Sequence, residues 1–223
     1  MKIIKPYIEQ MSPPINGMEF LKRIEKAGRV CYKSEDKITE ESAIKFVKTL
    51  IKNGHEAMIE HGEAISIKFV CDRGVSHEIV RHRLFSFAQE STRYCNYGKE
   101  DEITVIDPCF WQPPYFTFST GERCYQAWKE SCEFAEKTYL DLINLGHAKP
   151  QEARSVLPNS LKTEIIVTGN LREWRHFFKL RTAKNAHPQM QEVANMALDL
   201  LSSQIPVVFD DILEVRNDIR TRT

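Results

Sequence analysis

The sequence of 223 residues lacks several features that identify whole classes of protein. It has no run of 18 apolar residues, so we expect no helix that spans a bilayer. Its first residues contain no long apolar stretch followed by a small-residue cleavage site, and we therefore expect no signal peptide. The chain also has no formal net charge, because 31 Lys and Arg balance 31 Asp and Glu. This neutrality argues against a protein that coats nucleic acid without sequence preference and against a polybasic membrane-binding protein, since both need a net positive field.

Familiar cofactor and metal motifs are missing as well. There is no Gly-x-Gly-x-x-Gly, so a Rossmann phosphate loop has no support, and no His-Glu-x-x-His of the metalloprotease kind. The six cysteines never form Cys-x-x-Cys, which argues against zinc-ribbon and thioredoxin-type sites. A chain of this length can bury about 70% of its unfolded surface and needs no disulfide framework. We therefore expect reduced thiols and a cytoplasmic location.

The composition and the apolar spacing are those of a globular protein. Hydrophobic residues make up 42% and charged residues 28% of the chain, which rules out wholesale disorder. Helical spacing predicts helices over 20–30, 39–54 and 120–146, a short one from Pro150 to Pro158, one opened by the capping box Asn170-Leu-Arg-Glu173, and a last one from Pro188. Period-2 alternation predicts strands over 64–70 and 161–168. The Pro- and aromatic-rich residues 104–119 predict an ordered loop.

The order of these elements predicts an α+β fold. No Gly/Ser-rich linker, repeat or low-complexity stretch divides the chain, so we predict a single domain over residues 1–223. Strands and helices mix without strict alternation, which favours a central, mostly antiparallel sheet flanked by long helices. The predicted strands are too few to form a well-covered sheet within one chain. We therefore expect a homo-oligomer, in which neighbouring chains supply the missing cover.

One segment, Glu78-Ile-Val-Arg-His-Arg-Leu-Phe-Ser-Phe-Ala-Gln-Glu-Ser-Thr-Arg-Tyr94, combines cations with apolar residues. We predict a helix here that starts near His77 with Ser76 as its cap, so that Arg81 and Arg83 point in different directions. Buried unpaired charges are costly, so these cations need anionic partners. Arginine suits planar, bidentate recognition of phosphate or carboxylate. The alternative is a solvated helix face with internal ion pairs, such as Glu78 with Arg81.

The spacing within this segment resembles the signature of the flavin-dependent thymidylate synthases, which reads Arg-His-Arg, seven residues, Ser, and Arg two further on. Arg81, His82, Arg83, Ser91 and Arg93 occupy those positions. Further segments that resemble the family are Gly54-His55-Glu56 with Glu60-His61, Ala153-Arg154 with Leu157-Pro158, and Asn170-Leu-Arg172 with His176 and Leu180-Arg181. The chain departs from the pattern at Gln89, where some members have Glu, at Ala57, where others have a hydroxyl, and at His176, where some have Asn.

The resemblance implies a homotetramer, with active sites shared between subunits, that methylates dUMP reductively to dTMP. It implies 5,10-methylenetetrahydrofolate as the methylene donor, NADPH as the reductant, FAD as the hydride carrier, and no metal. It places dUMP against Glu78, Arg81, Gln89, Ser91, Arg93, Arg154 and Arg181. It places FAD against His55, Ala57, Glu60, Arg81, His82, Arg83, Gln89, Asn170, Arg172 and His176.

The resemblance makes Arg181 the catalytic cation. A cation beside N3 and O4 of uracil favours the anionic ring, which is electron-rich at C5 without a covalent adduct. We therefore expect no cysteine nucleophile, and none of the six cysteines has an evident partner base. For His55 and His176 a purely structural role is the alternative. The aromatic run from Phe110 to Phe118 either closes over folate or nicotinamide or serves packing.

Two other functions compete with this interpretation. A nucleic-acid-binding module would use the 81–93 segment, but the chain has neither net positive charge nor a wider basic stripe. A hydrolase would hold a metal with His55, His61 and His82. Neither explains the spacing of Ser91 and Arg93.

Overall fold

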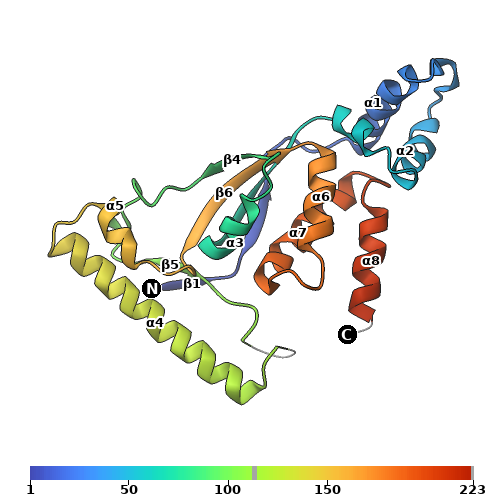
Figure 1. The fold of residues 1–223 in the computed structure, drawn as a ribbon. Helices are drawn as coiled ribbons and strands as arrows, with labels where there is room; N and C mark the ends of the chain where they lie inside the picture. The colour runs from blue at the N-terminus through green and yellow to red at the C-terminus, as the bar shows by residue number, and fades with distance from the viewer. Residues whose placement is uncertain (112–114, 222–223) are drawn as a thin grey trace. The chain divides into compact units, whose positions relative to one another are not determined.

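The structure, a computed structural model, describes residues 1–111 and 115–221. It contains both helices and strands (Figure 1). The chain divides into two compact units. Unit 1 comprises Met1–Tyr7, Phe69–Arg81 and Ala88–Ile165, and unit 2 comprises Ile8–Lys68, His82–Phe87 and Ile166–Thr223. Among the described residues, no helix is both long and apolar enough to cross a membrane.

Within the described residues, six strands form two sheets. They are β1 (Lys2–Ile4), β2 (Tyr7–Gln10), β3 (Ile65–Asp72), β4 (Ser86–Gln89), β5 (Thr104–Ile106) and β6 (Lys162–Gly169). The four-stranded sheet has the order β2-β3-β6-β4, and β1 pairs in parallel with β5, with Lys2 opposite Thr104. The boundaries between the two units fall within β2, β3, β4 and β6.

The two long strands β3 and β6 run antiparallel. Ser66 Oγ on β3 lies 2.8 Å from Thr168 Oγ1 near the end of β6. Just beyond the other end of β3, the Arg73 backbone N–H donates to the Leu161 carbonyl oxygen at 3.1 Å. Early residues of one strand therefore face late residues of the other, as antiparallel pairing requires.

Strands β4 and β6 are antiparallel for the same reason. The Glu90 N–H, directly after β4, donates to the Glu164 carbonyl oxygen at 2.9 Å, near the start of β6. Phe85, directly before β4, packs its ring on Gly169 at the end of β6, where a Cβ would lie 2.2 Å from Phe85 Cδ1. The predicted mostly antiparallel sheet is thus confirmed for the pairs that β6 makes.

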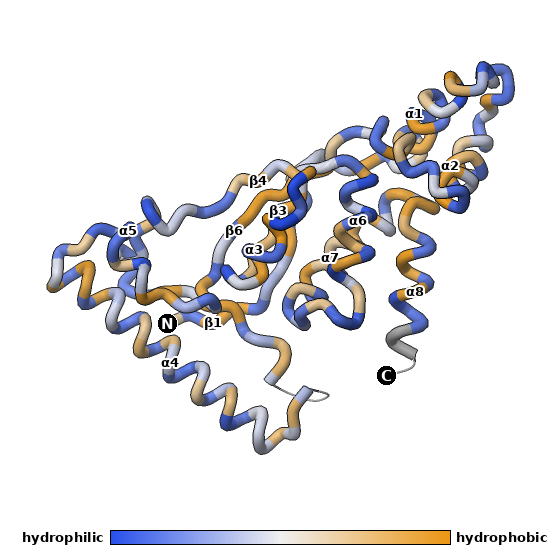
Figure 2. The backbone as a smooth tube through the Cα atoms, viewed as in Figure 1, coloured by the Kyte–Doolittle hydropathy of each residue, from blue (hydrophilic) through white to orange (hydrophobic). Residues whose placement is uncertain are grey.

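Unit 1 contains the long helix α4 (Phe118–Asn144) together with α3 (Arg73–Ile79), α5 (Pro150–Ala153) and the short 3₁₀ turns η3 (Tyr97–Lys99) and η4 (Arg154–Val156). α4 contacts α5 and both turns, and Figure 1 shows it in yellow-green. Its hydropathy alternates along its length in Figure 2, because one face packs while the rest is exposed. Cys132 and Tyr139 on α4 join Ile103, Val105 and Leu161 in a core cluster.

Unit 2 holds the remaining helices of the described residues. They are α1 (Gly17–Val30), η1 (Glu35–Lys37), α2 (Ser42–Lys52), η2 (Glu56–His61), α6 (Leu171–Arg181), α7 (Pro188–Gln204) and α8 (Asp210–Thr221). α6 packs against α7 and α8, while α1 packs against α2 and η2. Trp174, Phe177 and Phe178 on α6 are fully buried and meet Phe85 and Phe209 ring to ring. This aromatic core holds α6 in place, and α6 carries several of the predicted site residues.

Most predicted helices and both predicted strands are confirmed, with shifted ends. The helix predicted from Asn170 begins at Leu171, and Asn170 Oδ1 accepts from the Glu173 N–H at 3.0 Å. α2 begins at Ser42 with Glu41 as its N-cap rather than Thr39, because Thr39 instead bonds the Ser42 hydroxyl. Gly54 ends this helix as predicted, with a φ of 72° that favours glycine.

The prediction for residues 77–94 is wrong. The Asp72 carboxylate caps α3 by accepting from the Val75 N–H at 2.6 Å, so the helix starts at Arg73, and Ser76 lies buried within it. The loop predicted over 104–119 contains strand β5, and Phe118 begins α4; residues 112–114 of that run lie outside the described residues. Strands β1 and β2 and helix α8 were not predicted, because they are short or follow the last marked apolar stripe.

Candidate active site

The Arg-His-Arg segment lies in a turn rather than on a helix. α3 ends at Ile79, and the Phe85 N–H donates to the His82 carbonyl oxygen at 3.1 Å immediately before β4 begins. Arg81 and Arg83 are exposed, whereas His82 is only 4% exposed. The two arginines are therefore available to anionic ligands, while the histidine between them is a buried structural element of unit 2.

Unit 1 contains six of the seven predicted dUMP residues. They are Glu78, Arg81, Gln89, Ser91, Arg93 and Arg154. Arg154 Nη1 donates to Thr92 Oγ1 at 3.2 Å, and the Arg93 N–H donates to Ser91 Oγ at 3.3 Å. The loop after β4 and the turn η4 are thus brought together, although they are 62 residues apart in sequence. The guanidinium groups of Arg93 and Arg154 remain exposed beside a half-buried serine hydroxyl.

Gln89 is held by the sheet and by α3. Its Nε2 donates to Ser76 Oγ at 2.9 Å and to Thr163 Oγ1 at 3.2 Å. Arg73 Nη1 also donates to Thr163 Oγ1, at 3.3 Å. These contacts fix the amide at the end of β4 in one orientation, as recognition of a base edge or a sugar hydroxyl requires.

Glu90, which follows Gln89, forms a separate polar cluster with Tyr97 and Lys162. Its carboxylate accepts from Tyr97 OH at 2.7 Å and from Lys162 Nζ at 3.1 Å. Burial alone would lower the pKa of Lys162, but hydrogen bonds to Glu164 and Glu90 raise it above its ordinary value. Burial, followed by the hydrogen bond to Glu90, raises the pKa of Tyr97. The Glu90 charge is neutralised inside unit 1 and does not oppose the exposed arginines.

In unit 2 the buried His82 contacts the predicted catalytic arginine. Arg181, on the last turn of α6, donates from Nε to His82 Nε2 at 3.0 Å. Burial, followed by the charges of Arg181 and His176, lowers the pKa of His82 to about 4. His82 is therefore neutral near pH 7, and its Nε2 is the acceptor, because an arginine Nε can only donate.

The other predicted FAD residues of unit 2 lie on α6 and around η2. Exposed Arg172 forms an ion pair with exposed Glu60. His176 is exposed, and its ring centroid lies 5.6 Å from that of His82. Asn170 caps α6. Of the predicted FAD residues, only Arg81 and Gln89 belong to unit 1.

A cavity of about 510 Å³ lies beside η2. His55 and Ala57 line it, together with the apolar side chains of Phe46 and Met58 and with Tyr32. Its mixture of aromatic, apolar and imidazole groups suits a planar heterocycle.

The structure brings together one possible metal-ligand group among the described residues. Ligand atoms of His82, Glu173 and His176 lie within 4.8 Å of one another. His55 and His61, expected to join His82 in the hydrolase interpretation, are not in this group. His82 Nε2 already accepts from Arg181, and a cation at this group would lie beside a guanidinium. The arrangement therefore disfavours a metal cation at this group.

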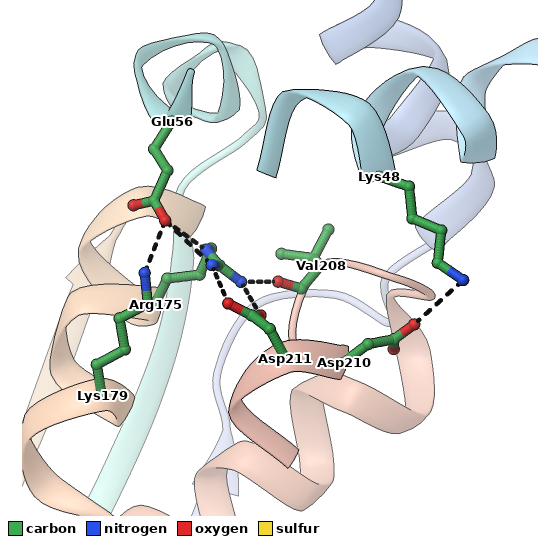
Figure 3. Close-up of polar contacts among 7 residues, drawn as sticks. All are labelled: Lys48, Glu56, Arg175, Lys179, Val208, Asp210 and Asp211. Atoms are coloured by element: carbon green, nitrogen blue, oxygen red, sulfur yellow. Dashed lines mark hydrogen bonds and ion pairs between the residues drawn. The ribbon is translucent and has the colours of Figure 1, made fainter. Parts of the chain in front are cut away.

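A buried arginine that sequence reasoning missed connects η2 to α6 and α8. Arg175 is completely buried and donates to Glu56 Oε1 at 3.0 Å, to Asp211 Oδ1 at 2.7 Å and to the Val208 carbonyl oxygen (Figure 3). Lys179 Nζ donates to the same Glu56 oxygen at 2.7 Å. Burial would raise the pKa of Glu56, but Lys179 and Arg175 lower it below the ordinary value. This network sets the position of η2, which carries the predicted FAD residues Ala57 and Glu60.

All six cysteines are free thiols. Cys71 and Cys132 are buried, and burial is the largest cause that raises the pKa of each thiol. A raised pKa disfavours the nucleophilic thiolate. The expectation that no cysteine acts as the nucleophile stays a prediction, with these two thiols the least suited.

Comparisons with known proteins agree with the sequence signature. Residues 15–207 match the family described as "Thymidylate synthase complementing protein". A flavin-dependent thymidylate synthase of Corynebacterium aurimucosum is 34% identical over 204 residues, which covers 84% of this chain and 78% of that protein. The enzyme of the same name from Corynebacterium glutamicum is 34% identical over 91% of this chain and 82% of its own length.

A solved structure shares the fold. A UMP/dUMP methylase, PolB from Streptomyces cacaoi, bound with 5-Br dUMP, superposes with a TM-score of 0.78 over 93% of this chain and 95% of its own, at 22% identity. The fold similarity and the sequence matches each cover most of the chain. The chain belongs to the family of flavin-dependent thymidylate synthases.

Proposed function

We propose that this protein methylates dUMP reductively to dTMP as a flavin-dependent thymidylate synthase. The methylene group comes from 5,10-methylenetetrahydrofolate and the reducing equivalents from NADPH, with FAD as the hydride carrier. The observation that carries this proposal is the Arg81–Arg93 signature in a chain that matches the family over most of its length. The exposure of Arg81, Arg83 and Arg93 supports it, because a neutral protein needs local cations to hold two phosphate-bearing ligands.

For dUMP, we assign the phosphate to Arg93, Arg154 and the Ser91 hydroxyl. These groups lie together in unit 1, held by the bonds from Arg154 to Thr92 and from Arg93 to Ser91. Gln89, fixed by Ser76 and Thr163, offers the oriented amide for the nucleoside. Arg81 and Glu78 complete this part of the proposed dUMP contacts.

The residues present fit a flavin dinucleotide. The exposed donors Arg83, Arg172 and His176 suit a pyrophosphate, and Asn170 places a helix N-terminus nearby. The cavity beside His55 and Ala57 is large enough for a planar ring system. When bound, FAD supplies the hydride that reduces the transferred one-carbon unit.

Arg181 is the proposed catalytic residue. Its guanidinium, held beside N3 and O4 of the uracil, stabilises the negative charge of the ring and makes C5 electron-rich. The bond from Arg181 Nε to His82 Nε2 orients this guanidinium at the end of α6. No cysteine adduct is needed in this scheme.

The cheapest test uses the purified protein. We expect a yellow protein with a flavin spectrum that oxidises NADPH faster when dUMP is added and that forms dTMP when methylenetetrahydrofolate is also present. Colourless protein that neither binds added FAD nor responds to dUMP would contradict the proposal. Arg181→Ala, matched with Arg23→Ala on the exposed surface of α1, assigns the activity to the proposed residue.

The proposal includes a cytoplasmic homotetramer with active sites shared between subunits. The seven dUMP residues therefore need not all come from one chain. The surface of α4 supports an oligomer, because Phe118 and Phe134 are 80% and 73% exposed. Light scattering coupled to size exclusion should give four times the chain mass of 25.9 kDa. A monomer at working concentration would contradict this part of the proposal.

A further inference from the structure

Glu173 occupies a capping-box position, but its carboxylate is used elsewhere. The Asn170 side chain accepts from the Glu173 N–H, which is the first half of the box. The second half, a bond from the Asn170 N–H to the Glu173 carboxylate, does not form in the described part of the chain. Glu173 is only 4% exposed, and its Oε1 lies 3.5 Å from His82 Nδ1. A glutamate is rarely buried in this way unless it has a partner.

The other nitrogen of the same imidazole determines what His82 presents to Glu173. Arg181 Nε donates to His82 Nε2, so Nε2 carries no proton. The neutral ring therefore carries its proton on Nδ1, the nitrogen that faces Glu173. Nδ1 is buried and lies within ion-pair range of the carboxylate, but it has no hydrogen-bond partner among the described residues. The carboxylate thus acts on this N–H through its charge.

We propose that Glu173 is a positioning residue, which fixes His82 as the Nδ1-protonated tautomer so that Nε2 can hold the Nε of Arg181. The chain of contacts runs Glu173–His82–Arg181 within unit 2, and all three side chains are carried by α6 or by the turn that α6 covers. Phe85 and Phe177 pack on the imidazole, with ring centroids 6.1 Å and 5.0 Å away, and hold its plane.

This arrangement has a consequence for the reaction. A histidine of the opposite tautomer would point an N–H at the Arg181 Nε–H and push the guanidinium away. Arg181 would then keep its charge but lose its orientation toward the uracil. Only the effect on the orientation of Arg181 toward the uracil rests on the proposed function, because the tautomer of His82 can be measured without substrate.

The test compares Glu173→Leu with Glu173→Gln, whose amide oxygen can still face the Nδ1–H. Solid-state NMR of protein with ¹⁵N-labelled histidine distinguishes the two neutral tautomers, and the spectrum of His82→Gln assigns the His82 signals. We expect the Nδ1-protonated form in the wild type and in Glu173→Gln, and its loss in Glu173→Leu. Glu25→Leu is the matched control, because Glu25 is a fully buried glutamate of unit 2 bonded to Arg29 and Ser42.

Kinetics gives the second readout. Glu173→Leu should lower kcat for dTMP formation by about 100-fold, the typical effect of a misplaced catalytic group, while the KM for NADPH changes little. Glu173→Gln should recover much of the rate, and Glu25→Leu should behave as the wild type. An Nε2-protonated His82 in the wild type, or an unchanged tautomer in Glu173→Leu, would overturn the inference. A wild type that makes no dTMP would refute the proposed function and leave the tautomer result standing.

Discussion

Burial of His82 makes the free energy of unfolding depend on pH. Its pKa is about 4 in the folded protein and about 6.5 in an unfolded chain. Between these values the unfolded chain binds a proton that the folded protein does not, so stability falls as the pH is lowered from 6.5 to 4. The full difference is about 3 kcal/mol. Above pH 6.5 the contribution is constant.

Urea denaturation between pH 4.5 and 7.5 measures this effect. The wild type should lose stability relative to His82→Gln as the pH falls, because the variant lacks the titrating group. His77→Gln, at an exposed position on α3, is the control for removing a histidine. Parallel curves for the wild type and His82→Gln would show that His82 is not buried as a neutral ring.

Arg175 should be among the most sensitive positions for stability. Arg175→Met fills much of the same volume but leaves Glu56 and Asp211 without their guanidinium. Breaking a buried pair from one side costs about 3–5 kcal/mol, and we expect the lower end because Asp211 is 45% exposed and can be hydrated. Lys129→Met, which removes the exposed pair with Glu133, should cost less than about 1 kcal/mol. Equal midpoints in urea for the two variants would contradict this.

At the scale of single residues, sequence reasoning found the exposed groups of the site better than the buried ones. Arg81, Arg83 and Arg93 are exposed and stand at fixed spacings within one short segment, so the sequence alone reveals them. Glu173 and Arg175 owe their roles to partners about 90 and 120 residues away, at His82 and Glu56. Such roles depend on tertiary contacts, which no local pattern encodes.

At the scale of elements, apolar periodicity predicted the helices that bury one stripe. α7 is the clearest case, because its predicted face, including Val193, Ala197 and Leu201, is buried. The prediction was wrong around α3, because apolar residues continue past Ile79 into β4 with a spacing that resembles one long helix. The deciding feature was the Asp72 cap, which starts the helix a full turn before the predicted position. Strands of three or four residues, such as β1, are too short to show a period.

Gly169 links strand β6 to the turn before β4, and we predict that Gly169→Ala destabilises the protein. An added Cβ would lie 2.2 Å from Phe85 Cδ1, and this ring is confined by Trp174 at a centroid distance of 4.7 Å. Overpacking of this kind costs about 1–3 kcal/mol. Urea denaturation should show a much smaller cost for Gly169→Ala when Phe85→Leu is already present. Equal costs in both backgrounds would show that the ring is not the obstacle.

At the scale of the whole chain, the two units cannot be separated by a single cut. Each is assembled from three segments, and the boundaries fall within continuous strands such as β3, β4 and β6. A fragment that contained one unit would end its strands in the middle of the ladder. The predicted single domain over residues 1–223 therefore implies that both units unfold in one cooperative transition.

The three tryptophans allow this to be tested unit by unit. Trp111 and Trp128 belong to unit 1 and Trp174 to unit 2. Trp174→Phe leaves only unit 1 reporters, and the double variant Trp111→Phe with Trp128→Phe leaves only the unit 2 reporter. In each protein we expect the fluorescence and far-UV circular dichroism transitions in urea to coincide, because a two-state transition looks the same to every probe. A fluorescence midpoint that differs from the circular dichroism midpoint in either protein would show that the units unfold separately and that residues 1–223 form two domains.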